Sequence, residues 1–124
     1  MQEITRVVLD AMGGDHAPAE MVKGAIDAVN MRDDIVVILT GQKDVIEDEL
    51  KKYTYPAEKI EIVNAEEVIE TAEPPVMAIR KKKNSSIVVG MNMIKNKEAD
   101  AFVSAGSSGA TLVGGQVKYR KSVV

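Results

Sequence analysis

The chain has 124 residues, of which 45% are hydrophobic and only 3% aromatic, so its core must be built from aliphatic side chains. A chain of this length buries roughly two thirds of its unfolded surface, and one domain is expected. The absence of cysteine excludes disulfides, a thiolate metal site and a cysteine nucleophile, and suits a cytoplasmic compartment. The net charge of −3 argues against a general nucleic-acid binder, and no apolar run approaches the roughly 18 residues of a membrane span.

The apolar pattern predicts alternating strands and helices. A β-branched run over 4–10 predicts a strand, and helical spacing of apolar residues over 18–29 predicts a helix. The almost continuously apolar run 35–40 is typical of a parallel strand buried on both faces. The remaining expected elements are, in chain order, a helix over 45–53, a strand over 60–63, a short helix over 66–70, a helix over 76–83, a helix starting at Asn84-Ser85-Ser86 and reaching Ile94, a strand over 100–104, a turn over 105–109 and a helix over 110–120. This order predicts an α/β fold with a mainly parallel sheet and helices on both faces.

Two glycine-bearing loops follow the ends of predicted strands and lead to predicted helices. The first is 11–18, directly after Asp10, and the second is 105–109, directly after Ser104. Ligands bind beyond the carboxyl ends of parallel strands, and glycine loops at helix starts favour anions such as phosphate. A Gly/Ser turn that only caps a helix is the alternative for the second loop. Neither a P-loop nor a dinucleotide fingerprint occurs, which favours free phosphate or a phosphorylated small molecule.

Titratable groups in the first loop are candidates for chemistry. His16 is the only histidine, so it cannot build a multi-histidine metal site. It can hydrogen-bond an oxyanion or donate a proton near neutral pH, and a structural loop histidine is the alternative. Asp10 and Asp15 can orient a base or bind a cation, and turn or helix-cap roles are the alternative.

A run of four cations, Arg80-Lys81-Lys82-Lys83, stands out in this acidic chain. The run precedes a predicted helix start. One interpretation is a solvated face that complements a helix dipole. The other is a cationic wall for a phosphate or an acidic partner.

Three segments in this order resemble PlsX-type phosphate acyltransferases. Leu9–Pro18 (LDAMGGDHAP) is similar to the family's N-terminal signature, Arg80–Ser86 (RKKKNSS) to its R-K-K-x-x-S-S segment, and Ser104–Ala110 (SAGSSGA) to its S-A-G-N/S-T/S-G-A loop. Ile87 stands where that pattern usually has methionine. The resemblance ends near Val117, so 1–117 is expected to be the N-terminal part of a longer PlsX-like α/β domain, followed by a divergent tail over 118–124.

The resemblance implies transfer of an acyl group from acyl-(acyl carrier protein) to inorganic phosphate, for phospholipid synthesis. It also implies a three-layer α/β/α fold like that of isocitrate/isopropylmalate dehydrogenases, a homodimer, a possible peripheral membrane contact, and no cofactor or obligatory metal. The implied catalytic residues are His16, Asp10 and Lys82. The implied phosphate- and substrate-binding residues are Gly13, Gly14, Asp15, Lys81, Lys83, Ser85, Ser86, Ser104, Gly106, Ser107, Ser108 and Gly109.

Two other functions stay open at this point. One is a non-catalytic phosphate-binding fragment. The other is a phosphotransacetylase-like enzyme that uses coenzyme A thioesters, whose phosphates would suit the cations of 80–83 equally well. Since the family's later residues are missing, we expect this chain alone to have negligible activity.

Overall fold

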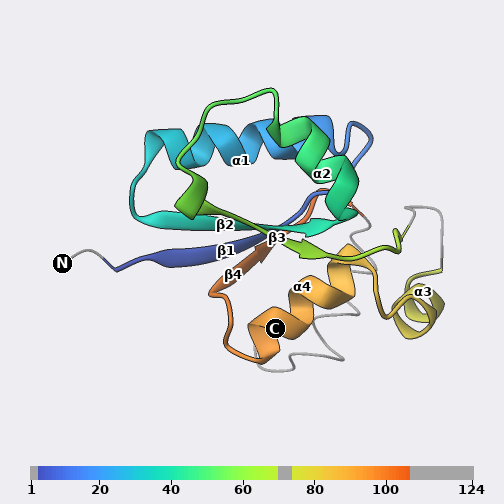
Figure 1. Ribbon diagram of the computed structural model, residues 1–124. Coiled ribbons are helices and arrows are strands. Elements are labelled where there is room, and N and C mark those ends of the chain that lie inside the picture. The colour runs from blue at the N-terminus through green and yellow to red at the C-terminus, as the bar shows by residue number, and fades with distance from the viewer. Residues whose placement is uncertain (1–2, 70–73, 107–124) are drawn as a thin grey trace.

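The computed structural model describes residues 3–69 and 74–106. These residues form a four-stranded sheet in the order β3-β2-β1-β4, in which all neighbouring strands run parallel (Figure 1). The elements are, in chain order, β1 (Thr5–Asp10), α1 (Ala19–Met31), β2 (Ile35–Gly41), α2 (Lys43–Leu50), a 3-10 helix η1 (Ala57–Lys59), β3 (Ile60–Asn64), α3 (Pro75–Lys81), α4 (Ser86–Lys95) and β4 (Ala101–Val103).

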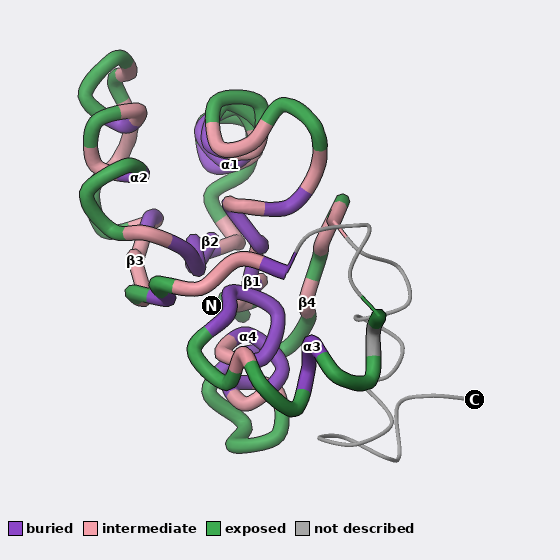
Figure 2. The backbone as a smooth tube through the Cα atoms, turned by 90° about the vertical axis from the view of Figure 1, so that its right-hand side faces the viewer, coloured by how far each residue is buried: buried purple, intermediate pink, exposed green. Residues whose placement is uncertain are grey.

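Helices cover both faces of the sheet, which confirms the predicted α/β class. Figures 1 and 2 show α1 and α2 on one face and α3 and α4 on the other. The chain steps outward from β1 to β3, then returns past β1 to β4. Because parallel crossovers are right-handed, this reversal sends the helices after β3 to the opposite face.

The predicted short helix over 66–70 is wrong in its described part. Residues 65–69 are not helical, and Glu67 instead forms an isolated parallel bridge with Ser85. The Glu67 N–H donates to the Asn84 carbonyl at 3.1 Å, and a Glu67 carboxylate oxygen accepts from the Asn84 N–H at 3.1 Å. This long-range pairing uses backbone groups that a local helix would need.

The other described α-helices and strands agree with the prediction, with shifted ends, whereas the 3-10 helix η1 was not predicted. The second helix covers Lys43–Leu50 rather than 45–53, and Tyr53 packs against the core from beyond its end. Ser85 is the N-cap of α4 and accepts from the Val88 N–H at 3.2 Å, as expected for this helix start. Most of the turn over 105–109 and the helix predicted over 110–120 lie outside the described residues.

The core is aliphatic on both faces of the sheet, as the composition predicts. Under α1 and α2, the main buried residues are Val22, Ile26, Leu39, Ile46 and Leu50. On the opposite face, α4 buries Ile87, Val88 and Met91 with partly buried Phe102 beside them. None of the helices in the described ranges is long and apolar enough to cross a membrane.

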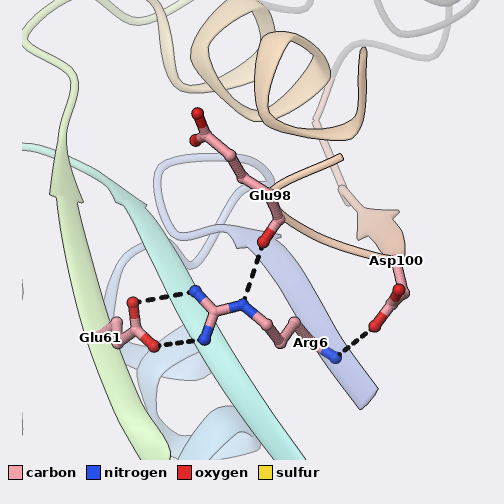
Figure 3. A network of polar contacts seen from close by, with 4 residues as sticks. All are labelled: Arg6, Glu61, Glu98 and Asp100. Carbon is pink, nitrogen blue, oxygen red and sulfur yellow. Dashed lines mark hydrogen bonds and ion pairs between the residues drawn. The ribbon is translucent and has the colours of Figure 1, made fainter. Parts of the chain in front are cut away.

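Arg6 joins three strands near the end of the sheet opposite the carboxyl ends (Figure 3). Its guanidinium donates to both carboxylate oxygens of Glu61 on β3, at 2.7 and 3.1 Å, and so bridges across β2. Its Nε donates to the Glu98 carbonyl at 3.0 Å, and its backbone N–H donates to Asp100 Oδ2 at 2.8 Å, just before β4. The hydrogen bond with Glu61 raises the pKa of Arg6 above its usual value.

Gly90 sets how closely α4 approaches β4. A Cβ at Gly90 would lie 2.6 Å from the Cδ1 atom of Phe102, whereas a Cβ at Gly24 on α1 would meet no atom within 4 Å. We expect Gly90→Ala to lower the free energy of unfolding by about 1–3 kcal/mol through overpacking. Gly24→Ala is the matched control and should raise it by about 0.5–1 kcal/mol, because alanine is the better helix former.

Urea denaturation followed by circular dichroism measures both changes. Adding Phe102→Leu to the Gly90→Ala chain should recover part of the loss, since the two side chains share one contact. A Gly90→Ala chain that gains as much stability as the Gly24→Ala chain would contradict this packing.

Candidate functional site

The Asp10 carboxylate lies at the end of β1 and joins three separate segments. It is 1% exposed. Its Oδ1 accepts from Ser86 Oγ at 2.5 Å and from the Met12 N–H at 3.0 Å, and its Oδ2 accepts from Ser104 Oγ at 2.8 Å. Because Ser86 and Ser104 are 76 and 94 positions away along the chain, this one group brings together all three sequence motifs.

The elements around Asp10 hold its partners in place. Ser86 is the first residue of α4, directly after the Ser85 cap, and its carbonyl accepts from the Thr40 hydroxyl at 3.1 Å. Ser104 follows β4, and its Oγ also accepts from the Gly106 N–H at 3.0 Å. Within residues 3–69 and 74–106, every buried side-chain nitrogen or oxygen has a hydrogen-bond partner. Asp10, Ser86 and Ser104 therefore form a fully bonded buried cluster.

The two glycine loops are in contact next to this cluster. A Cβ at Gly13 would lie 2.6 Å from Asp10 Oδ2 and 2.8 Å from the Gly106 nitrogen, so only glycine fits there. A Cβ at Gly106 would lie 3.2 Å from the Gly13 Cα. Gly14 has φ +94°, a left-handed conformation that favours glycine. The described residues of the two loops therefore lie in contact, which the sequence did not predict.

The loops lie at the switch point of the sheet. β1 and β4 are neighbours, but the chain leaves β1 toward β2 on its other side. In open α/β sheets, ligands bind at this position, outside the carboxyl ends of the strands. Among the described residues, the N–H groups of Gly14, Asp15 and His16 have no hydrogen-bond partner, and α1 begins at Ala19. This edge of the sheet therefore presents donors suited to an anion.

The hydroxyls of Ser86 and Ser104 bind Asp10 and so have no proton left for an anion. A hydroxyl carries one proton, and those of Ser86 and Ser104 are donated to Asp10. In this arrangement the two oxygens offer only lone pairs to a ligand. Ser85 is buried at the start of α4 and caps that helix.

The charged candidates lie further out. Asp15 and His16 are exposed in the first loop. Lys81 is exposed as the last residue of α3, and Lys83 is exposed just beyond this helix. Lys82 is half-buried, and its Nζ donates to the Val68 carbonyl at 2.6 Å, so its predicted catalytic role stays a prediction. Ser107, Ser108 and Gly109 lie outside the described residues. Among the described side chains, no group of three His, Cys, Asp or Glu could hold a metal ion.

Sequence reasoning missed Thr40. This buried residue near the end of β2 donates to the Ser86 carbonyl and so connects a third strand to the cluster. Its backbone carbonyl also accepts from the Ala11 N–H at 2.9 Å. The sequence did offer one sign of this role: Thr40 places a hydroxyl directly after the apolar run Ile35–Leu39, and packing does not require a polar side chain there.

Comparison with known proteins places the chain in a family. Residues 5–123 match the model of a family described as Fatty acid synthesis protein. The chain belongs to this family. The phosphate acyltransferase of Alkaliphilus oremlandii is 54% identical over 110 residues, which are 89% of this chain and 32% of that protein. The phosphate acyltransferases of Clostridium beijerinckii and Halothermothrix orenii are 52% and 47% identical over 88% and 89% of this chain, in each case 33% of the relative.

The family membership confirms the resemblance predicted from the three motifs. The matched stretch is the N-terminal part of these relatives, and the chain spans about a third of their length. Residues of all three motifs, namely Gly13, Ser86, Ser104 and Gly106, meet around Asp10.

We expect substitutions at Asp10 to destabilise the fold in a graded way. Asp10→Ala leaves the Met12 N–H and two serine hydroxyls without their acceptor and should lower the free energy of unfolding by about 3 kcal/mol. Asp10→Asn keeps one acceptor oxygen and should cost less. Asp15→Ala, at an exposed position of the same loop, is the control and should change stability by no more than about 0.5 kcal/mol.

Urea unfolding of the three variants measures this order. The chemical shift of the Met12 amide proton provides a local readout, because it should move in both Asp10 variants. Equal destabilisation by Asp10→Ala and Asp15→Ala would show that Asp10 does not organise the loops.

Proposed function

We propose that this chain is the N-terminal part of an enzyme that transfers an acyl group from acyl-(acyl carrier protein) to inorganic phosphate. The product is an acyl phosphate. One observation carries the proposal: the glycine loops after β1 and β4 are in contact at the switch point of the sheet, beside the buried Asp10 cluster. Relatives named phosphate acyltransferase, which are 54% and 52% identical to this chain, support acyl transfer to phosphate as the class of reaction.

The reaction needs a held dianion and stabilisation of new negative charge. A phosphate oxygen attacks the thioester carbonyl carbon, the carbonyl oxygen becomes an oxyanion, and the C–S bond then breaks to release a thiolate. Positioning and fixed donors supply most of such a rate enhancement. The N–H groups of Gly14, Asp15 and His16 have no hydrogen-bond partner within residues 3–69 and 74–106. We propose these groups and the start of α1 as the phosphate donors.

We propose that His16 acts directly on the reacting atoms. Its side chain is exposed in the first loop, two residues after Gly14. There it can donate a hydrogen bond to the oxyanion or a proton to the leaving thiolate. Asp10, Ser86 and Ser104 are positioning residues in this proposal, because both serine hydroxyls donate their protons to the Asp10 carboxylate.

The part of the relatives that this chain does not span completes the site in our proposal. By the family resemblance, that enzyme is a cytoplasmic homodimer with the isocitrate/isopropylmalate dehydrogenase-like fold. The remaining substrate-binding groups and the dimer contacts then lie beyond this chain, and the chain alone has negligible activity.

Phosphate binding by the 124-residue chain can be measured by two-dimensional NMR. Titration with inorganic phosphate should move the amide signals of Gly14, Asp15 and His16, while sodium chloride at equal ionic strength should not. In Gly13→Ala, where a Cβ would press on Asp10 and Gly106, the shifts should be lost. Shifts spread evenly over the surface lysines would contradict a phosphate site at these loops.

Acyl transfer is measured as phosphate-dependent release of the free carrier thiol. The chain alone should release no more thiol than a protein-free control. In a full-length relative, the substitution that matches His16→Ala should lower kcat by about 10²–10³-fold. Unchanged kcat would remove His16 from the mechanism. A strong preference for coenzyme A thioesters would favour the phosphotransacetylase-like alternative.

A further inference from the structure

The outer face of α3 combines exposed apolar and cationic side chains. Val76 and Met77 are 47% and 51% exposed, whereas Ala78 and Ile79 on the same helix are buried against the core. Arg80, Lys81 and Lys83 are exposed beside them. We call the five exposed residues, Val76, Met77, Arg80, Lys81 and Lys83, the α3 surface.

The cations of the α3 surface have no acidic partner among the described residues. The ion pairs found in that part of the chain involve arginines and lysines of other elements, on β1, α1's end and α2. In a chain with a net charge of −3, such a local excess of positive charge attracts an acidic partner and would be screened by salt.

The α3 surface is directly connected to the site. Only Asn84 and Ser85 separate Lys83 from Ser86, whose hydroxyl donates to Asp10. The Lys82 side chain between the exposed cations donates to the Val68 carbonyl and so ties the end of α3 to the neighbouring segment. A partner bound on α3 is therefore held near the start of α4, whose Ser86 contacts Asp10.

We propose that the α3 surface docks an acidic protein, the acyl carrier that delivers the thioester. This inference rests on the proposed function and adds the place where the carrier binds. The exposed apolar pair would be covered at the centre of the contact, and the three cations would face acidic side chains at its rim. A small, charge-dominated interface suits a carrier that must leave after each transfer.

Two observations favour a protein over the other anionic partners. A free phosphate ion would not bury the apolar side chains of Val76 and Met77. A membrane surface is disfavoured because α3 has only seven residues and exposes two large apolar side chains, far less than the apolar face of an interfacial helix.

The test measures binding of a bacterial acyl carrier protein, with its phosphopantetheine arm attached, to the 124-residue chain by biolayer interferometry. Lys81→Glu with Lys83→Glu should weaken binding at least about tenfold, because like charges then face each other across the interface. Lys23→Glu with Lys51→Glu, on α1 and at the end of α2, makes the same change in net charge at exposed sites and is the matched control. This control should change binding by less than about twofold.

The apolar half of the surface is tested separately. Val76→Ser with Met77→Ser should weaken binding by about threefold or more at every salt concentration, since burial of apolar area does not depend on screening. Circular dichroism of each variant checks that the fold is retained, as expected for exposed positions.

Equal losses in the two charge-reversal pairs would overturn the docking surface in favour of a general charge effect. Binding to vesicles with anionic lipid, lost in the Lys81/Lys83 pair, with no binding of the carrier would also overturn it. Failure of the proposed function is recorded by the phosphate titration instead. Carrier binding that depends on the α3 surface, in a chain that binds no phosphate, would support the docking surface and refute the phosphate site.

Discussion

The structure depends on one buried carboxylate. Removing an ionised group from water is unfavourable unless hydrogen bonds replace its hydration. Asp10 receives three such bonds, and each donor belongs to a different segment: the first loop, the start of α4 and the end of β4. None of these segments can shift without leaving the carboxylate short of a donor. The relative positions of both glycine loops and of α4 are thus set by a single side chain at the end of β1.

This arrangement divides the polar groups of the site into two sets. The serine hydroxyls and the carboxylate satisfy one another and fix the geometry. The backbone N–H groups of Gly14, Asp15 and His16 have no partner among the described residues and are available to a ligand. Asp10 can lie near the phosphate site that we propose, because its carboxylate is buried and already accepts three hydrogen bonds. The phosphate proposal depends on this separation.

The two ends of the sheet serve different needs. At one end, Arg6 connects β1 to β3 and to the residues before β4 through a bidentate ion pair and two further hydrogen bonds (Figure 3). At the other end, the ends of the strands carry the Asp10 cluster and the glycine loops. The switch point between β1 and β4 lies at this second end, where ligands bind in open α/β sheets.

The sequence by itself determined the α/β class, most strands, a helix start at Asn84-Ser85-Ser86 and the family, because these follow from local periodicity, residue types and motifs. It failed at 66–70, where composition permits a helix but pairing between Glu67 and Asn84 takes the backbone groups. Only the tertiary structure decided that Asp10, Ser86 and Ser104 share one cluster and that Thr40 supports it. Those contacts join residues dozens of positions apart in the sequence. Which residues meet depends on the order of the strands in the sheet, and the local pattern of apolar and polar residues does not determine that order.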